Sequence, residues 1–218
     1  MKKQLAITHL PARLILLCAG LCIMALGVAF SIKAALGTSP ISSFPYVTSY
    51  ISGLSVGTTT IIINTFLVLI QIPILRSKYQ WFQLLQLPAV ILFGLMIDVC
   101  GILIQGIIYT NYFQQWILCL IGILLVGLGV SIEVTAGLVT TAGEGVVLAV
   151  CQVLPVRFST MKIIFDVTLV CISIIVSLVF VGRLEGVREG TIAAAVCVGL
   201  VTRQCQKPMK WFSRKCLA

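Results

Sequence analysis

Six long apolar runs constrain the fold of this chain more than any other feature of its sequence. They lie at about residues 13–35, 56–75, 83–108, 115–135, 159–182 and 190–203 of 218. A helix needs roughly 20 apolar residues to cross a bilayer. With 60% apolar and 10% charged residues, the chain is far more apolar than a water-soluble domain. We therefore expect an all-α polytopic membrane protein with six transmembrane helices, folded as a single membrane domain over residues 1–218.

The first run shares one feature with a secretory signal peptide, because Lys2, Lys3 and Arg13 precede it. The apolar region of a signal peptide has roughly 7–15 residues. The apolar run here is longer and continues into more apolar sequence. We interpret it as the first membrane span.

Basic residues occur in three groups, which set the expected orientation of the spans. They precede the first run, follow the second and end the chain: Lys2, Lys3, Arg13; Arg76, Lys78; and Arg203, Lys207, Lys210, Arg214, Lys215. Loops rich in Lys and Arg face the cytoplasm, and six spans with both termini inside bring all three groups to that side. The net charge of +9 is then a topology signal rather than a sign of nucleic-acid binding. Residues 204–218 form a basic cytoplasmic tail in this interpretation, available to anionic lipid, a protein partner or a second copy of the chain.

The nine cysteines and the single histidine do not indicate a metal or redox site. Most of the cysteines lie in apolar sequence, no Cys-x-x-Cys spacing occurs, and His9 lies near the start of the chain. We expect the cysteines to pack as small apolar side chains, with no metal site and no cofactor.

An internal repeat is the second constraint. Leu36-Gly37-Thr38-Ser39-Pro40 returns in altered form as Leu138-Val139-Thr140-Thr141-Ala142, 102 residues later. The same offset pairs Asn64 with Asp166. Apolar positions match easily by chance, so the small and polar pairs carry the argument. We expect two repeats, the first at about residues 13–108 and the second at about residues 115–203.

The segment from Thr38 to Gly53 is too short to cross a membrane. Pro40 suits the first turn of a helix, Thr38 and Ser39 are candidate caps, and Gly53 is a candidate stop. We expect a re-entrant half-helix here and a second one at the equivalent segment 138–155. A helix that lies in the membrane interface would have the same pattern.

Three spans in each repeat, an odd number, invert the second copy relative to the first. The expected fold is therefore six transmembrane helices in two inverted three-span repeats, each with a re-entrant half-helix. In transporters of this architecture, broken helices meet near the membrane midplane and direct their amino-terminal ends at the substrate. Free N–H groups and the helix dipole favour an anion or a carboxylate at such ends.

Polar residues at and beside the two breaks are the candidate solute-binding groups. They are Thr38, Ser39, Asn64, Thr140, Thr141, Lys162 and Asp166. Lys162 and Asp166 are four residues apart on one helix face, so a structural ion pair is an equally good interpretation of these two.

Three further acidic residues, Asp98, Glu133 and Glu144, are candidates for ion or proton coupling. An ionised side chain at mid-bilayer costs at least ~2.5–3.5 kcal/mol on insertion scales, so such residues are rarely kept without a partner or a function. Glu144 lies at the head of the second half-helix, where the dipole favours a carboxylate and a capping role suffices. Its charge weakens the case for a simple anion and suits a zwitterionic or amine-bearing solute.

Three motifs complete a family resemblance: Leu36-Gly37-Thr38-Ser39-Pro40, Gly94 with Asp98, and Gly186-Val187-Arg188-Glu189-Gly190-Thr191. Through them the chain resembles the bacterial YczE/YyaS/YitT-type integral membrane proteins over about residues 13–203. It most resembles the YczE branch, which lacks the soluble carboxy-terminal domain of the YitT branch. The resemblance implies a multi-pass protein of the bacterial plasma membrane and supplies no substrate.

Two functions fit these features. The first is secondary transport of a small polar solute, anionic or zwitterionic, and the second is a membrane-embedded accessory or regulatory role without transport. We do not expect an enzyme, because the sequence has no nucleophile with a paired histidine and no phosphate-binding loop. A transporter should keep a polar cavity that reaches Thr38, Thr140, Asn64 and Asp166, whereas a scaffold should pack these positions without one.

Overall fold

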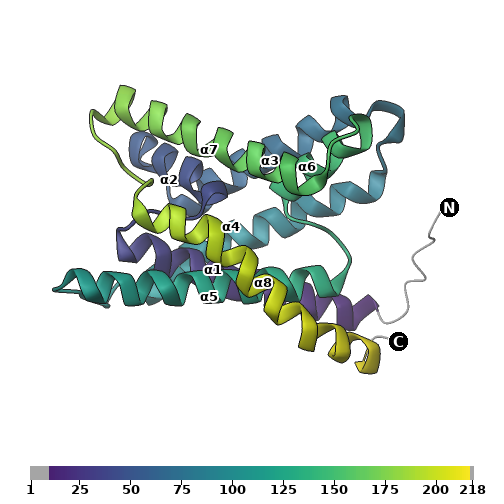
Figure 1. Ribbon diagram of the computed structural model, residues 1–218, viewed down its shortest axis with the longest axis horizontal. Coiled ribbons are helices and arrows are strands. Elements are labelled where there is room, and N and C mark those ends of the chain that lie inside the picture. The colour runs from purple at the N-terminus through teal and green to yellow at the C-terminus, as the bar shows by residue number, and fades with distance from the viewer. Residues whose placement is uncertain (1–9, 217–218) are drawn as a thin grey trace.

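The computed structural model describes residues 10–216, and the expectations for Lys2, Lys3 and His9 lie outside that part of the chain. The described residues form helices and the turns between them, with no strand (Figure 1). The elements are α1 (Leu10–Ala34), α2 (Pro40–Ser52), α3 (Val56–Leu75), η1 (Arg76–Lys78), η2 (Trp81–Leu85), α4 (Gln86–Leu103), α5 (Tyr112–Ala136), α6 (Ala142–Val153), α7 (Phe158–Val181) and α8 (Glu189–Cys216).

Five helical segments of the described chain are long and apolar enough to cross a membrane. They are built on α1, α3, α4, α5 and α7, which confirms the first five predicted spans with ends shifted by a few residues. The helix α8 is not among them. It is 28 residues long, but its apolar part ends near Thr202 and basic residues follow from Arg203. The sixth span stays a prediction.

The two short helices lie where the sequence predicts them. The first, α2, has 13 residues, begins with Pro40 and ends at Gly53, whose φ of 71° is the left-handed conformation of a helix stop. The second, α6, has 12 residues. Ser39, one of the two candidate caps, occupies the cap position of α2 but makes no side-chain cap hydrogen bond, and neither does Thr141 in the cap position of α6. The hydroxyl of Ser39 donates to Ser42 Oγ instead.

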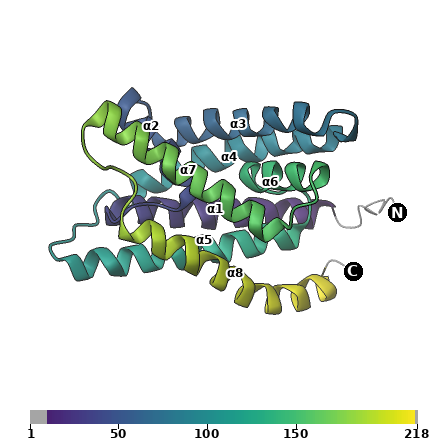
Figure 2. The same cartoon turned by 45° about the horizontal axis from the view of Figure 1, so that its top comes forward.

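The helix boundaries follow the offset found in the sequence. The helices α5, α6 and α7 begin 102 residues after α1, α2 and α3 respectively. The most extensive helix packing in the described chain also joins equivalent helices, since α1 lies along α5 (Figures 1 and 2). The short helices α2 and α6 lie towards opposite ends of the molecule, and α1 begins and α8 ends at the α6 end.

Glycines bring α1 and α5 into backbone contact. A Cβ atom on Gly27 would lie 2.7 Å from the backbone nitrogen of Val126 and 2.8 Å from the carbonyl oxygen of Gly122. A Cβ atom on Gly129 would lie 2.7 Å from the carbonyl oxygen of Gly20. Because Gly20 meets Gly129 while Gly27 meets Gly122, the two helices are antiparallel. Small residues are the usual means of close helix approach in membranes, where lipid is as apolar as the core and packing must supply the attraction.

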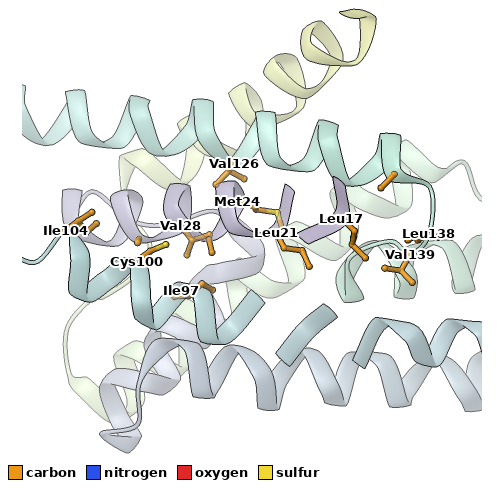
Figure 3. Close-up of a cluster of buried hydrophobic side chains, with 13 residues drawn as sticks. Leu17, Leu21, Met24, Val28, Ile97, Cys100, Ile104, Val126, Leu138 and Val139 are labelled. Atoms are coloured by element: carbon orange, nitrogen blue, oxygen red, sulfur yellow. The ribbon is translucent and has the colours of Figure 1, made fainter. Parts of the chain in front are cut away.

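A cluster of buried apolar side chains extends this contact to α4 and to the chain before α6. Figure 3 shows its labelled members, which are Leu17, Leu21, Met24, Val28, Ile97, Cys100, Ile104, Val126, Leu138 and Val139. Cys100 packs in the cluster as a free thiol, and every cysteine in the described side chains is free. The packing therefore fixes the segment that leads into α6 against the central helix pair.

Candidate solute site

A cavity of about 340 Å³ lies where the two short helices begin. All eight α-helices contribute to its wall, with Pro40 of α2 and Ala142 of α6 on the lining. The first turns of these helices are in contact, because a Cβ atom on Gly143 would run into the side chain of Ile41. Two segments 102 residues apart in the sequence thus meet at one cavity.

Most of the polar wall comes from positions that the sequence singles out. Six of the seven candidate solute-binding residues line the cavity: Ser39, Asn64, Thr140, Thr141, Lys162 and Asp166. Glu133 and Glu144, two of the three candidates for ion or proton coupling, line it as well. The helix bounds explain this, since the residues lie at the starts of α2 and α6 and on the faces of α3, α5 and α7 that cover those starts.

Thr38 is the solute-binding candidate that does not line the cavity. The chain turns at Gly37, whose φ is 93°, and buries Thr38 against the loop before α8. There the Thr38 N–H donates to the carbonyl oxygen of Gly186 at 3.1 Å, and the Gly190 N–H donates to the carbonyl oxygen of Leu36 at 2.8 Å. The expectation that the cavity reaches Thr38 is corrected: this residue joins two of the sequence motifs into one structural unit.

Asp98, the third coupling candidate, also lies off the cavity wall. Its carboxylate accepts a hydrogen bond from Ser55 Oγ at 2.6 Å and one from the Gly57 N–H at 2.7 Å. Both donors are at the start of α3, where free N–H groups and the helix dipole favour a negative charge. Gly94 allows this approach, since a Cβ atom there would lie 2.6 Å from the Gly57 carbonyl oxygen. The structure therefore shows Asp98 as a cap at the start of α3, and its role in ion or proton coupling stays a prediction.

The two glutamates on the cavity wall, Glu133 and Glu144, have different surroundings. Glu133 of α5 is 3% exposed, and its carboxyl group lies against the backbone N–H of Thr141. Glu144 is in the first turn of α6 and lies within electrostatic range of Glu133, Lys162 and Asp166. Neither forms an ion pair with a described residue, whereas Lys162 Nζ and Asp166 Oδ1 are 2.6 Å apart. The wall thus has one closed ion pair and two further carboxyl groups.

The sequence analysis does not identify two buried glutamines that secure the start of α6. Gln71 Nε2 donates to Gln86 Oε1 at 3.1 Å and to the carbonyl oxygen of Ala142 at 3.3 Å. Gln71 is fully buried and Gln86, which lines the cavity, is 4% exposed. Each glutamine interrupts an apolar run, which is the sequence signal that points to them. Ser42, Thr60 and Thr202 are further polar lining residues outside the predicted set.

The long apolar helices define the class of the protein: it is an all-helical, multi-pass membrane protein with a central cavity.

The chain belongs to the family of unknown function DUF6198, whose model matches residues 11–207. It is similar to the "uncharacterized protein YyaS" of Bacillus subtilis (strain 168), with 29% identity over 182 residues that cover 83% of this chain and 85% of YyaS. It is also similar to the "uncharacterized membrane protein YczE" of the same strain, with 34% identity over 121 residues that cover 55% of this chain and 54% of YczE. No solved structure gives a significant match. The resemblance to YczE/YyaS-type proteins is confirmed.

Proposed function

We propose that this protein is a secondary transporter of a small polar solute, anionic or zwitterionic, in the bacterial plasma membrane. The proposed role is not enzymatic. The observation that carries the proposal is the central cavity at which α2 and α6 both begin. Transporters of the inverted-repeat type bind their substrates between broken helices in this way.

The proposed architecture has six spans in two inverted repeats, with both termini in the cytoplasm. The glycine contact between α1 and α5 supports it, because the offset exchanges Gly20 with Gly122 and Gly27 with Gly129. The contact is therefore reciprocal, as in a two-fold related pair, and the equivalent helices are antiparallel. In this proposal α8 crosses the membrane as the equivalent of α4, and its basic end stays on the cytoplasmic side.

The starts of the two short helices suit a polar ligand. The Ser39 and Thr141 side chains leave the first N–H groups of α2 and α6 without a side-chain cap, and both residues line the cavity. Such helix ends favour a carboxylate or another anion. Glu133 and Glu144 on the same wall favour positive charge. A zwitterion satisfies both requirements, and a plain anion satisfies only the first.

Accessibility of the cavity from the two sides of the membrane tests transport against an accessory role. We would replace the native cysteines, introduce Ser42→Cys on the cavity wall, and label with a membrane-impermeant maleimide. A transporter that alternates between two open states should be labelled both in right-side-out and in inside-out vesicles. Labelling from neither side contradicts transport and supports the accessory role. Phe66→Cys, at an outward-facing side chain that is 62% exposed, is the control for reagent that reaches thiols through lipid.

A further inference from the structure

The charges of the cavity come from one half of the chain. The four ionisable residues on the wall, Glu133, Glu144, Lys162 and Asp166, all lie in α5, α6 and α7. At the equivalent positions of the first half, 102 residues earlier, stand the uncharged polar residues Ser31, Ser42, Thr60 and Asn64. Of these four, Ser42, Thr60 and Asn64 line the cavity, so the two halves present an ionisable surface and a neutral polar surface to the same space. A bound solute meets ionisable groups on one side of the cavity only.

The excess of acidic over basic residues on the wall disfavours a simple anion. Three acids face one base, and the base is already paired with Asp166. Glu133 and Glu144 remain without an ion-pair partner among the described residues, and Glu133 is almost completely buried. A buried carboxyl group without a partner must either stay protonated or have its charge compensated by a positive group. A cationic group on the solute would supply that compensation.

An unpartnered amide on the neutral surface independently indicates a polar ligand. Asn64 lines the cavity and is only 8% exposed. Its side chain forms no hydrogen bond to another residue in the described part of the chain, and its amide is not among the fully buried polar atoms that lack a partner, so it borders the open space of the cavity. An amide offers two donors and an acceptor, and these are available to a group that enters the cavity.

The largest part of the remaining wall is apolar. Side chains from α1, α4 and α5 form it: Leu21, Met24, Val28, Phe93, Val126 and Val130. These residues offer no hydrogen bonds and suit a compact hydrocarbon body. The volume of about 340 Å³ is of the size that small-molecule sites have.

We propose that the cavity binds a small amphipathic amine, with its ammonium group at Glu133 and Glu144 and its hydrocarbon body against α1, α4 and α5. The inference rests on the proposed transport function and changes its solute class, from an anion or a zwitterion to a solute that bears an ammonium group. An ammonium group has three donors, enough for two carboxylates and the Asn64 amide oxygen. A carboxylate on the same solute would be favoured near the amino-terminal ends of α2 and α6, which have no side-chain cap.

Four probes that share a 3-methylbutyl hydrocarbon body separate the charge requirements: isoamylamine, leucine, isocaproate and isocaproamide. Each is added at the same concentration to the purified full-length protein, and the thermal unfolding midpoint Tm is measured. We expect isoamylamine and leucine to raise Tm by about 2–4 °C at a concentration several times Kd. Isocaproate and isocaproamide should not raise it. If leucine raises Tm but isoamylamine does not, the solute must be a zwitterion. That result would overturn the proposal that an ammonium group with a hydrocarbon body is sufficient for binding.

Variants attribute the effect to the two carboxyl groups. Glu133→Gln and Glu144→Gln should each abolish the Tm rise with isoamylamine, whereas Glu185→Gln, in the loop before α8 and off the cavity wall, should retain it. If the Glu133→Gln variant does not fold, Glu133→Asp, which keeps the carboxyl group but shortens its side chain, replaces it in this test. If only isocaproate or isocaproamide raises Tm, the proposal of an amine solute is wrong, whereas the proposed transport function is not contradicted. No stabilisation by any probe counts against both, and full stabilisation of both Gln variants overturns the assigned site.

Discussion

Gly27 of α1 and Gly122 of α5 meet so closely that a Cβ atom on Gly27 would lie 2.8 Å from the Gly122 carbonyl oxygen. This contact holds together the two helices on which the rest of the molecule is assembled. It also defines their antiparallel direction, from which the relation between the two halves follows.

Gly27→Ala should therefore destabilise the protein. The added methyl group has backbone atoms of Val126 and Gly122 in its path, so α1 and α5 must move apart. Overpacking of this kind costs about 1–3 kcal/mol, and each kcal/mol lowers Tm by about 2–4 °C in a domain of this size. Gly101→Ala is the matched control, because a Cβ atom there meets nothing within 4 Å. Equal Tm values for the two variants would contradict the close contact.

Asp98→Ala should lower stability without affecting the cavity. The substitution removes the acceptor for Ser55 Oγ and the Gly57 N–H at the start of α3, a loss of about 1–3 kcal/mol. Because Asp98 is off the cavity wall, the Tm rise caused by a bound solute should equal that of the wild type. If a folded Asp98→Ala protein no longer shows the solute-induced rise in Tm, Asp98 contributes to solute binding and this prediction is wrong.

Gly37→Ala should be more harmful than Gly53→Ala. Both glycines have positive φ, at 93° and 71°, so both substitutions strain the backbone. Only at Gly37 would the new Cβ atom also collide, in this case with Thr191 Oγ1 and the backbone of Arg188, whereas the surroundings of Gly53 are open. We expect a larger fall in Tm for Gly37→Ala. Equal falls would mean that the loop before α8 does not hold the start of α2.

The pair of Lys162 and Asp166 should be coupled in stability. Lys162→Met leaves Asp166 without its partner at 2.6 Å, and Asp166→Leu leaves the lysine without one. Each single variant should be less stable than the double variant, because a partly buried charge without its partner is costly. Additive changes in a double-mutant cycle would show that the pair contributes nothing to stability. The solute-induced rise in Tm, measured on the same double variant, reports separately whether the pair also binds the ligand.

The sequence predicts the order of the helices well and their side-chain contacts less well. Apolar runs and the offset between repeats locate α1 to α7, because lipid admits few backbone structures and Pro40 and Gly53 mark the ends of α2. The meeting of Ser39, Thr140 and Thr141 at one cavity follows from the same repeat.

Side-chain roles depend on contacts between distant segments, which the spacing of residues along one helix does not reveal. Asp98 looks unpartnered on its own helix, and its donors, Ser55 Oγ and the Gly57 N–H, lie more than 40 positions earlier. The turn at Gly37 directs Thr38 into the loop at Gly186 rather than into the cavity, and nothing in the local sequence specifies that direction.

The sidedness of Ser52 and Leu154 tests the inverted arrangement most directly. These residues are 102 positions apart and both are exposed. Ser52 is the last residue of α2, and Leu154 directly follows α6. In a protein without native cysteines, Ser52→Cys should react with an impermeant maleimide only in right-side-out vesicles, and Leu154→Cys only in inside-out vesicles. Labelling of both residues from the same side would contradict two inverted halves and, with them, the central solute site.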